Sequence, residues 1–315
     1  MPSNLLATVN NTGTPPHPHL DRLLRQASVK STIPVAVAYP CDVDSLCAVM
    51  QAAAVGLIRP LLVGPRQRIE ATAAQAGIDL TTADIRATAD DPHAAAEETA
   101  VLCRDGVTRA IMKGSLHSDA LLGAVMAHKT GLRGDRRASH AFVMDIPGLD
   151  RPLLMTDCVV NIFPDLMAKS DIAQNAIELA HAIGIAKPRV AVLSAVETVN
   201  PAIPGTIDAA ALAKMADRGQ IIGGIVDGPL AYDNAISLRS AQNKGIASEV
   251  AGRSDVLLVP NLEAGNMIYK QLVYMADAEC AGIVLGMRVP IILTSRSDSV
   301  VARIASCALA ALIGT

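Results

Sequence analysis

The sequence predicts an α/β protein with two doubly wound domains, each a mostly parallel sheet with helices on both faces. Apolar β-type runs alternate with helical segments along nearly the whole chain, which is the pattern of repeated βα units. The runs are continuous in apolar residues, as expected for strands buried on both faces. With 315 residues, 51% of them hydrophobic, the chain is long enough for about two domains.

The first half opens with a leader, T-P-P-H-P-H, that carries His17 and His19 and is expected to be a flexible arm. The strands expected after it lie over residues 33–39, 60–63 and 107–112. The helices expected between and after them cover residues 43–55, a segment ending at 77, 91–103 and 118–128.

The alternation breaks once, where two apolar runs at residues 141–146 and 153–156 are joined by Pro147-Gly148-Leu149-Asp150. Pro-Gly between such runs predicts a hairpin, and this break is the candidate domain boundary. Further strands are expected over 190–194, 221–226, 256–259, 282–285 and 290–293, with helices over 165–184, 209–218, 234–244, 263–278 and 298–312. We therefore expect one domain over residues 1–145 plus 286–315 and a second over 146–285.

Composition excludes several classes of function. The net charge is −3 and aromatic residues make up 2% of the chain, so neither a basic field nor stacking platforms for nucleic acid are expected. The longest apolar stretch, residues 299–313, is broken by Arg303 and is short for a membrane span. The first residues do not read as a signal peptide, so we expect a cytoplasmic protein.

The six cysteines include no C-x-x-C pair, and they are expected to be small hydrophobic residues in a reducing compartment. The scattered histidines predict no metal site.

Polar residues that follow strands are the candidates for chemistry, because ligands bind beyond the carboxyl ends of strands in open α/β sheets. The densest cluster is T-S-R-S-D-S, whose members are Thr294, Ser295, Arg296, Ser297, Asp298 and Ser299. It precedes a helix that Ser297 or Asp298 could cap, which would make an anion site beside a guanidinium; the alternative is a solvated turn.

Lys113-Gly114-Ser115 also ends a strand, where Lys113 and Ser115 could bind an anion or simply form a turn. Asp157 and Asp227 follow strands as well, as a base or as turn residues. Asn266 and Lys270 are four apart on one helix, beside a separate apolar stripe of Ala264, Ile268, Leu272 and Met275. They either face a cleft between the domains or belong to a solvated face.

Residues 157–299 resemble the phosphate acetyltransferase and phosphate butyryltransferase family. The segments that carry the resemblance include TDCVVNIFPDL (156–166), SDVLLVPNLEAGNMIYKQLVYMADA (254–278) and PIILTSRSDS (290–299). The first half is similar more loosely, through MKGSLHSDALLGAVM (112–126). The forms T-S-R-S-D-S and L-V-Y-M are closer to the butyryl branch.

The resemblance implies a fold like that of the isocitrate and isopropylmalate dehydrogenases, with the site in a central cleft of a homodimer or higher homo-oligomer. It implies reversible transfer of an acetyl or butyryl group between coenzyme A and inorganic phosphate, giving acyl phosphate and CoA. CoA is then a substrate, and no cofactor is expected. Ser295 would stabilise the transition state and Arg296 would hold phosphate, with Thr294, Ser299, Lys113, Ser115, Asn266 and Lys270 binding substrate.

Three positions depart from the family pattern. Ala302 stands where acetyl-specific members carry an acidic residue proposed as the base for the thiol, and Asp298 is one hypothesis for a replacement. Residues 121–123 and 273–275 stand where those members carry arginines. Two alternatives remain: a catalytically impaired acyl-CoA-binding or regulatory protein of the same fold, and an oxidoreductase, which would need an aspartate cluster and a G-x-G-x-x-G run that the chain lacks.

Overall fold

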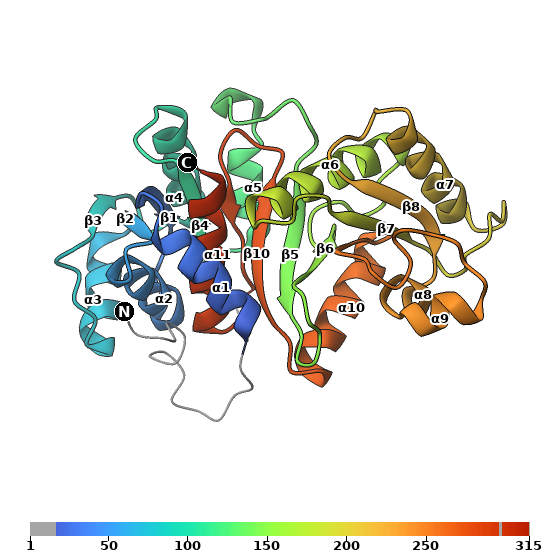
Figure 1. The fold of residues 1–315 in the computed structure, drawn as a ribbon. Helices are drawn as coiled ribbons and strands as arrows, with labels where there is room; N and C mark the ends of the chain where they lie inside the picture. The colour runs from blue at the N-terminus through green and yellow to red at the C-terminus, as the bar shows by residue number, and fades with distance from the viewer. Residues whose placement is uncertain (1–16, 296–297, 315) are drawn as a thin grey trace. The chain divides into compact units, whose positions relative to one another are not determined.

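The computed structural model describes residues 17–295 and 298–314. The chain divides into two compact units, residues 1–136 with 280–315 and residues 137–279 (Figure 1). Both are α/β units. The divisions fall at 136/137 and 279/280, whereas the sequence led us to expect 145/146 and 285/286. The expected boundary at 145/146 would separate the strand over residues 139–145 from its antiparallel partner over 153–156.

The sheet of the first unit runs in the order β3-β2-β1-β4-β11-β10, with all neighbours parallel except β10 and β11. The strands are β1 (Ile33–Ala38), β2 (Ile58–Gly64), β3 (Asp84–Ala87), β4 (Ala110–Lys113), β10 (Glu279–Leu285) and β11 (Ile291–Ile292). The helices are α1 (Pro18–Ser28), α2 (Val43–Ala54), α3 (Arg66–Ala76), α4 (Pro92–Arg104), α5 (Ser118–Val125), the 3₁₀ turn η1 (His128–Thr130) and α11 (Val300–Ile313).

The second unit has the strand order β5-β6-β9-β7-β8, in which only the β5–β6 pair is antiparallel. That pair is the expected hairpin. The strands are β5 (Ser139–Asp145), β6 (Leu153–Thr156), β7 (Arg189–Leu193), β8 (Ile225–Leu230) and β9 (Val256–Leu258). The helices are α6 (Leu166–Ala182), α7 (Pro204–Asp217), α8 (Tyr232–Ile236), α9 (Leu238–Asn243) and α10 (Leu262–Met275).

Helix α11 is the buried helix of the first unit. Every residue from Val301 to Ala311 is buried, and the helix packs against α1 and α2. A helix that is apolar all round is stable only in such a core, and its many alanines let neighbouring elements approach closely. Its N-terminus follows directly on the cap residue Ser299, close in the sequence to the predicted cluster at the end of β11.

Three sequence expectations are corrected here. The end of the leader is not a flexible arm but the start of helix α1, since Pro18 occupies the first turn and Leu20, Leu23, Leu24 and Ala27 form a buried stripe at helical spacing. Strand β8 begins at Ile225 instead of residue 221 because Gly223, at φ +84°, turns the chain first. The edge strand β3 was not expected, because it is mostly exposed and lacks an apolar run.

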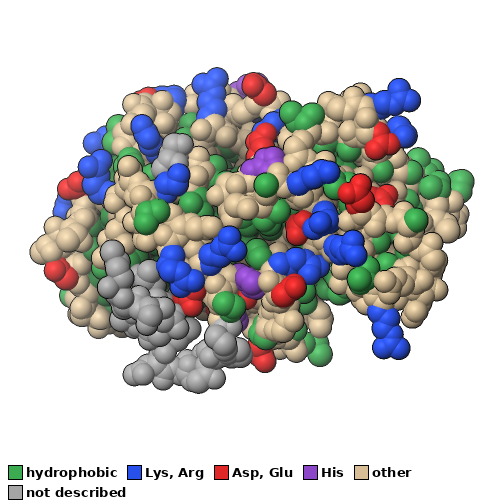
Figure 2. Space-filling model, viewed as in Figure 1, with side chains coloured by type: hydrophobic (Ala, Val, Ile, Leu, Met, Phe, Trp, Pro, Cys, Tyr) green, Lys and Arg blue, Asp and Glu red, His purple; other side chains and the backbone are tan. Residues whose placement is uncertain are grey.

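No helix in the described residues combines the length and the apolar character needed to cross a membrane. On the face drawn in Figure 2, Lys and Arg side chains are interspersed with Asp and Glu, in keeping with a net charge of −3.

Candidate active site

A pocket of about 300 Å³ lies in the first unit, at the ends of two strands. Its lining residues are Lys113, Leu116, His117, Ser118, Thr294 and Ser295. They come together because β4 and β11 are parallel neighbours, with Ile111 opposite Ile291 and Met112 opposite Ile292. The carboxyl ends of both strands therefore open at the same edge of the sheet.

Gly114 allows the first of these loops to turn tightly. A Cβ at this position would lie 2.5 Å from the carbonyl oxygen of Ala38 and 2.6 Å from that of Tyr39, so no other residue fits without a shift. The close approach brings the loop against strand β1 and leaves Lys113 at the pocket wall.

Lys113 is 3% exposed, and its Nζ donates to the carbonyl oxygens of Gly114 at 3.3 Å and Leu116 at 3.2 Å. Carbonyl acceptors of this kind compensate part of the desolvation of a buried ammonium group. The lysine thereby supplies a fixed positive charge at the pocket.

Thr294 is 4% exposed, and its Oγ1 is buried without a hydrogen-bond partner. A buried hydroxyl without a partner is unfavourable by about 1–3 kcal/mol, so its presence in a pocket wall calls for an explanation. A ligand atom that bonds to this hydroxyl would remove the penalty.

Ser295 is exposed in the pocket wall, and its backbone is held from two sides. Its N–H donates to Asp298 Oδ2 at 2.6 Å, and its carbonyl oxygen accepts from Arg303 Nη2 at 3.3 Å. Arg303 Nε also donates to the carbonyl oxygen of Asp298 at 3.4 Å. Arg303 is 3% exposed on α11, so a buried guanidinium clamps the turn that carries the serine.

Ser299 is the N-cap of α11, and its Oγ accepts from the N–H of Ala302 at 2.9 Å. The sequence had suggested Ser297 or Asp298 as the cap. Asp298 does not cap the helix, because its carboxylate accepts from the N–H of Ser295 instead. Arg296 and Ser297 lie outside the described residues.

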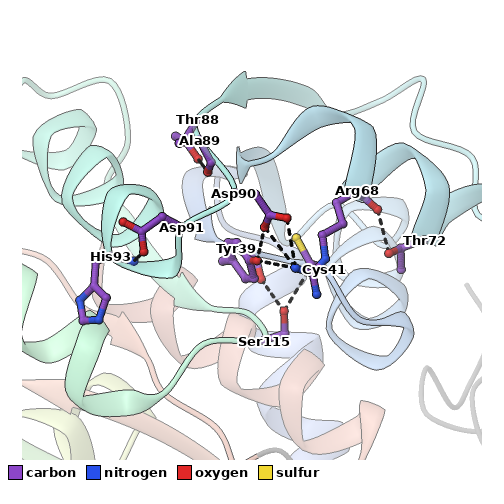
Figure 3. A network of polar contacts seen from close by, with 10 residues as sticks. All are labelled: Tyr39, Cys41, Arg68, Thr72, Thr88, Ala89, Asp90, Asp91, His93 and Ser115. Atoms are coloured by element: carbon purple, nitrogen blue, oxygen red, sulfur yellow. Dashed lines mark hydrogen bonds and ion pairs between the residues drawn. The ribbon is translucent and has the colours of Figure 1, made fainter.

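Ser115 faces strand β1. Its Oγ donates to the carbonyl oxygen of Tyr39 at 2.8 Å and accepts from the N–H of Cys41 at 3.1 Å. Figure 3 shows this contact beside a second one, in which the Tyr39 hydroxyl donates to Asp90 Oδ1 at 2.5 Å and accepts from Arg68 Nη1 at 2.7 Å. Burial, aided by the bond to Asp90, raises the pKa of Tyr39 to about 12. Ser115 thus fixes the loop after β4 to the end of β1.

Asn266 and Lys270 lie on α10 of the second unit. Asn266 is partly buried, and its Nδ2 donates to the carbonyl oxygen of Cys158 at 3.4 Å; Lys270 is exposed. The buried residues of this helix are Gly265, Tyr269 and Leu272. Leu272 confirms one member of the expected stripe, whereas Ala264 and Ile268 are only partly buried and Met275 is 79% exposed. Two contacts explain the difference, because Gly265 packs against Cys158 and Tyr269 stacks on Phe142 with ring centroids 4.0 Å apart.

Asp157 takes the turn role, not that of a base. Its two carboxylate oxygens accept from the backbone N–H groups of Val159, Val160 and Asn161 and from Asn161 Nδ2. Asp227 lies inside β8, where its Oδ1 accepts from the N–H of Gly228.

Four of the six cysteines are buried as expected, and the other two, Cys41 and Cys47, are partly exposed. Burial raises the pKa of Cys41 and Cys103 to about 11 and that of Cys307 to about 12, which makes these thiols poor nucleophiles. In the described part of the chain, no group of three or more His, Cys, Asp or Glu side chains could hold a metal ion.

The sequence led to Lys113, Thr294 and Ser295 but not to His117, Ser118 or Arg303. A signal for His117 and Ser118 was present in the sequence, since both directly follow Lys113-Gly114-Ser115-Leu116 at the start of a predicted helix. Arg303 gave none, because in the sequence it only interrupts an apolar helix.

Comparisons with known proteins extend across both units. A family model described as phosphate acetyl/butaryl transferase matches residues 95–311. The phosphate acetyltransferase of Rhizobium meliloti is 54% identical over 294 residues, 93% of this chain and 92% of that protein. The phosphate butyryltransferase of Clostridium acetobutylicum is 40% identical over 295 residues, 93% of this chain and 97% of that protein.

Among solved structures, a branched-chain phosphotransacylase from Enterococcus faecalis superposes with a TM-score of 0.78 at 27% identity, covering 89% of this chain and 98% of that one. Identity to the acetyltransferase exceeds identity to the butyryltransferase, whereas the motif forms led us to expect a closer likeness to the butyryl branch.

Proposed function

The chain belongs to the family of phosphate acetyl- and butyryltransferases, and from this premise we propose that it transfers a short acyl group between coenzyme A and inorganic phosphate. The reaction gives acyl phosphate and CoA and is reversible. CoA and phosphate are the substrates, and no cofactor takes part.

The observation that carries the proposal is the convergence of anion-binding groups in one pocket. Lys113 brings a fixed cation, Thr294 brings a buried hydroxyl without a partner, and Ser118 begins helix α5. The first N–H groups of a helix have no acceptor within it and carry a partial positive charge, which favours an anion. A phosphate group matches this set of donors in charge and in hydrogen-bonding capacity.

Ser295 is proposed as the group that stabilises the transition state. Its hydroxyl is exposed in the same pocket, so it can donate to the oxygen of an acyl carbonyl as negative charge develops there. Asp298 acts on it through the backbone, by the bond to the Ser295 N–H. Arg296 is proposed to hold phosphate, a role that rests on the family resemblance alone.

Four further residues are proposed to take part in binding, two of the first unit and two of the second. Ser115 and Ser299 support the pocket: the Ser115 hydroxyl bonds to the carbonyl oxygen of Tyr39 at the end of β1, and the Ser299 hydroxyl caps helix α11. Asn266 and Lys270 are proposed to bind CoA, because the A-G-N-x-x-Y-K segment is among the most distinctive features of the family resemblance.

The finer features of the fold and assembly are also proposals. Two doubly wound units support a fold like that of the isocitrate and isopropylmalate dehydrogenases. We propose a cytoplasmic homodimer or higher homo-oligomer, which light scattering on the purified protein would test.

The experiment that tests the function is phosphate-dependent release of free thiol from acetyl-CoA and butyryl-CoA, measured side by side. Release that requires phosphate would support the transferase, and the ratio of the two kcat/KM values would identify the preferred acyl group. Discrimination by pocket shape alone is about 10- to 200-fold per methylene. Folded protein that binds CoA but releases no thiol with either substrate would favour a binding protein of the same fold.

A further inference from the structure

The proposed reaction needs a proton acceptor that the family resemblance does not supply. The thiolate and not the thiol attacks a carbonyl carbon, so a base must take the proton of the CoA thiol. At the position where acetyl-specific relatives carry an acidic residue, this chain has Ala302, which has no titratable group and is 1% exposed.

Two other candidate bases near the pocket are already engaged. Lys113 Nζ donates to two carbonyl oxygens, an arrangement that suits a charged ammonium group and leaves no lone pair to accept a proton. Asp298 directs one carboxylate oxygen at the N–H of Ser295, 2.6 Å away, and so serves the geometry of the serine turn.

His117 lines the same pocket as Ser295, Thr294 and Lys113. It is the N-cap residue of α5, with φ −68° and ψ 145°, but its side chain makes no capping hydrogen bond. Residues at this position are usually Ser, Thr, Asp or Asn, because their side-chain oxygens accept from the first N–H groups of the helix. The imidazole of His117 makes no such bond. The ring is exposed and not committed to the helix end.

Imidazoles as a class change protonation state near neutral pH, so they both accept and return a proton under ordinary conditions. Among the described residues that line the pocket, His117 carries the one imidazole. In the proposed function Lys113 and Thr294 bind the phosphate group, which leaves the imidazole available to act on the sulfur.

We propose that His117 is the general base of this enzyme, an inference that rests on the proposed acyl transfer. An imidazole nitrogen takes the thiol proton as the CoA sulfur attacks the acyl carbonyl carbon. The C–S bond forms, the bond between the acyl carbon and the bridging phosphate oxygen breaks, and phosphate leaves with both electrons of that bond. The imidazolium then gives its proton to phosphate or water. In the reverse direction it protonates the departing thiolate.

The test replaces the imidazole in the full chain and supplies it again from solution. General acid–base catalysis contributes about 10²–10⁴-fold, so His117→Ala and His117→Gln should lower kcat by about 100-fold or more in both directions. KM for phosphate should change by less than about threefold, since the imidazole is not proposed to bind phosphate. Added imidazole should restore part of the turnover of His117→Ala in proportion to its concentration, which a merely structural role would not allow.

The matched control is His128→Gln, because His128 is an exposed histidine of the same unit that does not line the pocket. Its turnover should equal that of the wild type, with or without imidazole. Wild-type turnover in His117→Gln would overturn the assignment, and so would a loss that raises KM for phosphate and is not restored by imidazole. If the wild-type protein shows no phosphate-dependent thiol release, the proposed function itself fails, and that result is distinct from either of these.

Discussion

Arg303 and Ser295 are eight positions apart, yet Arg303 Nη2 donates to the carbonyl oxygen of Ser295 at 3.3 Å. The same guanidinium reaches the carbonyl oxygen of Asp298 through Nε. A planar guanidinium can hold two acceptors in a fixed relation, which an ammonium group cannot do. Arg303 is therefore a positioning residue for the serine turn, and its burial in α11 ties that turn to the core.

Replacing Arg303 should lower turnover without removing any group that touches substrate. We expect Arg303→Met to reduce kcat about 10- to 100-fold, because a shift of about 1 Å in a catalytic group can cost as much as 100-fold. Arg303→Lys should fall between Arg303→Met and the wild type, since one donor can still reach one carbonyl. Steady-state kinetics checks the order, and thermal unfolding confirms that the variants are folded. Equal kcat in all three proteins would show that the clamp is not needed.

Two substitutions of Asp298 distinguish a structural role of its carboxylate from a chemical one. An asparagine retains an oxygen that can accept the N–H of Ser295, so Asp298→Asn should keep kcat within about threefold of the wild type. Asp298→Ala removes the acceptor and should lower kcat about tenfold or more, in line with a loss of about 1.4 kcal/mol or more. The kcat values of the two variants at saturating substrate decide between these roles. If Asp298→Asn is as slow as Asp298→Ala, the charge is required and Asp298 becomes the better candidate for the base.

Sequence patterns predicted the strands other than β3 and half of the pocket, because both depend on local rules. Buried parallel strands appear as apolar runs, and their carboxyl ends share one edge, which brought Lys113 together with Thr294 and Ser295. The contact between Arg303 and Ser295 could not be predicted, because it depends on the tertiary placement of Ser295 beside the first turn of α11.

Helix α10 shows a second limit. Periodicity alone allows stripes one residue apart, and the expected one through Ala264 and Ile268 was wrong by one position. What decides the register is tertiary packing of Gly265 and Tyr269, which no pattern within the helix contains.

Gly265 should resist substitution. A Cβ there would lie 2.8 Å from Val259 Cγ2 and 2.9 Å from Cys158 Sγ, so Gly265→Ala should lower the free energy of unfolding by about 1–3 kcal/mol through overpacking. Gly123 is the matched control, because it is also helical but a Cβ there would have no neighbour within 4 Å. Gly123→Ala should raise stability by about 0.5–1 kcal/mol. Urea unfolding measures both, and a stabilising Gly265→Ala would contradict the close packing.

Thr294 should show opposite effects on stability and on substrate binding. Its Oγ1 is buried without a partner, so Thr294→Val, which keeps the shape, should leave the melting temperature unchanged or raise it. If that hydroxyl binds phosphate, the same change should raise KM for phosphate about two- to tenfold, the equivalent of one hydrogen bond.

Thr99→Val is the control for this pair of measurements. Thr99 is equally buried, but its Oγ1 donates to the carbonyl oxygen of Ala95 at 2.6 Å within α4. Its replacement should lower the free energy of unfolding by about 0.5–1.5 kcal/mol and leave KM for phosphate unchanged. A Thr294→Val protein that is clearly destabilised would mean that the hydroxyl is satisfied within the fold. One that keeps the wild-type KM would mean that phosphate is held by Lys113 and the helix terminus without it.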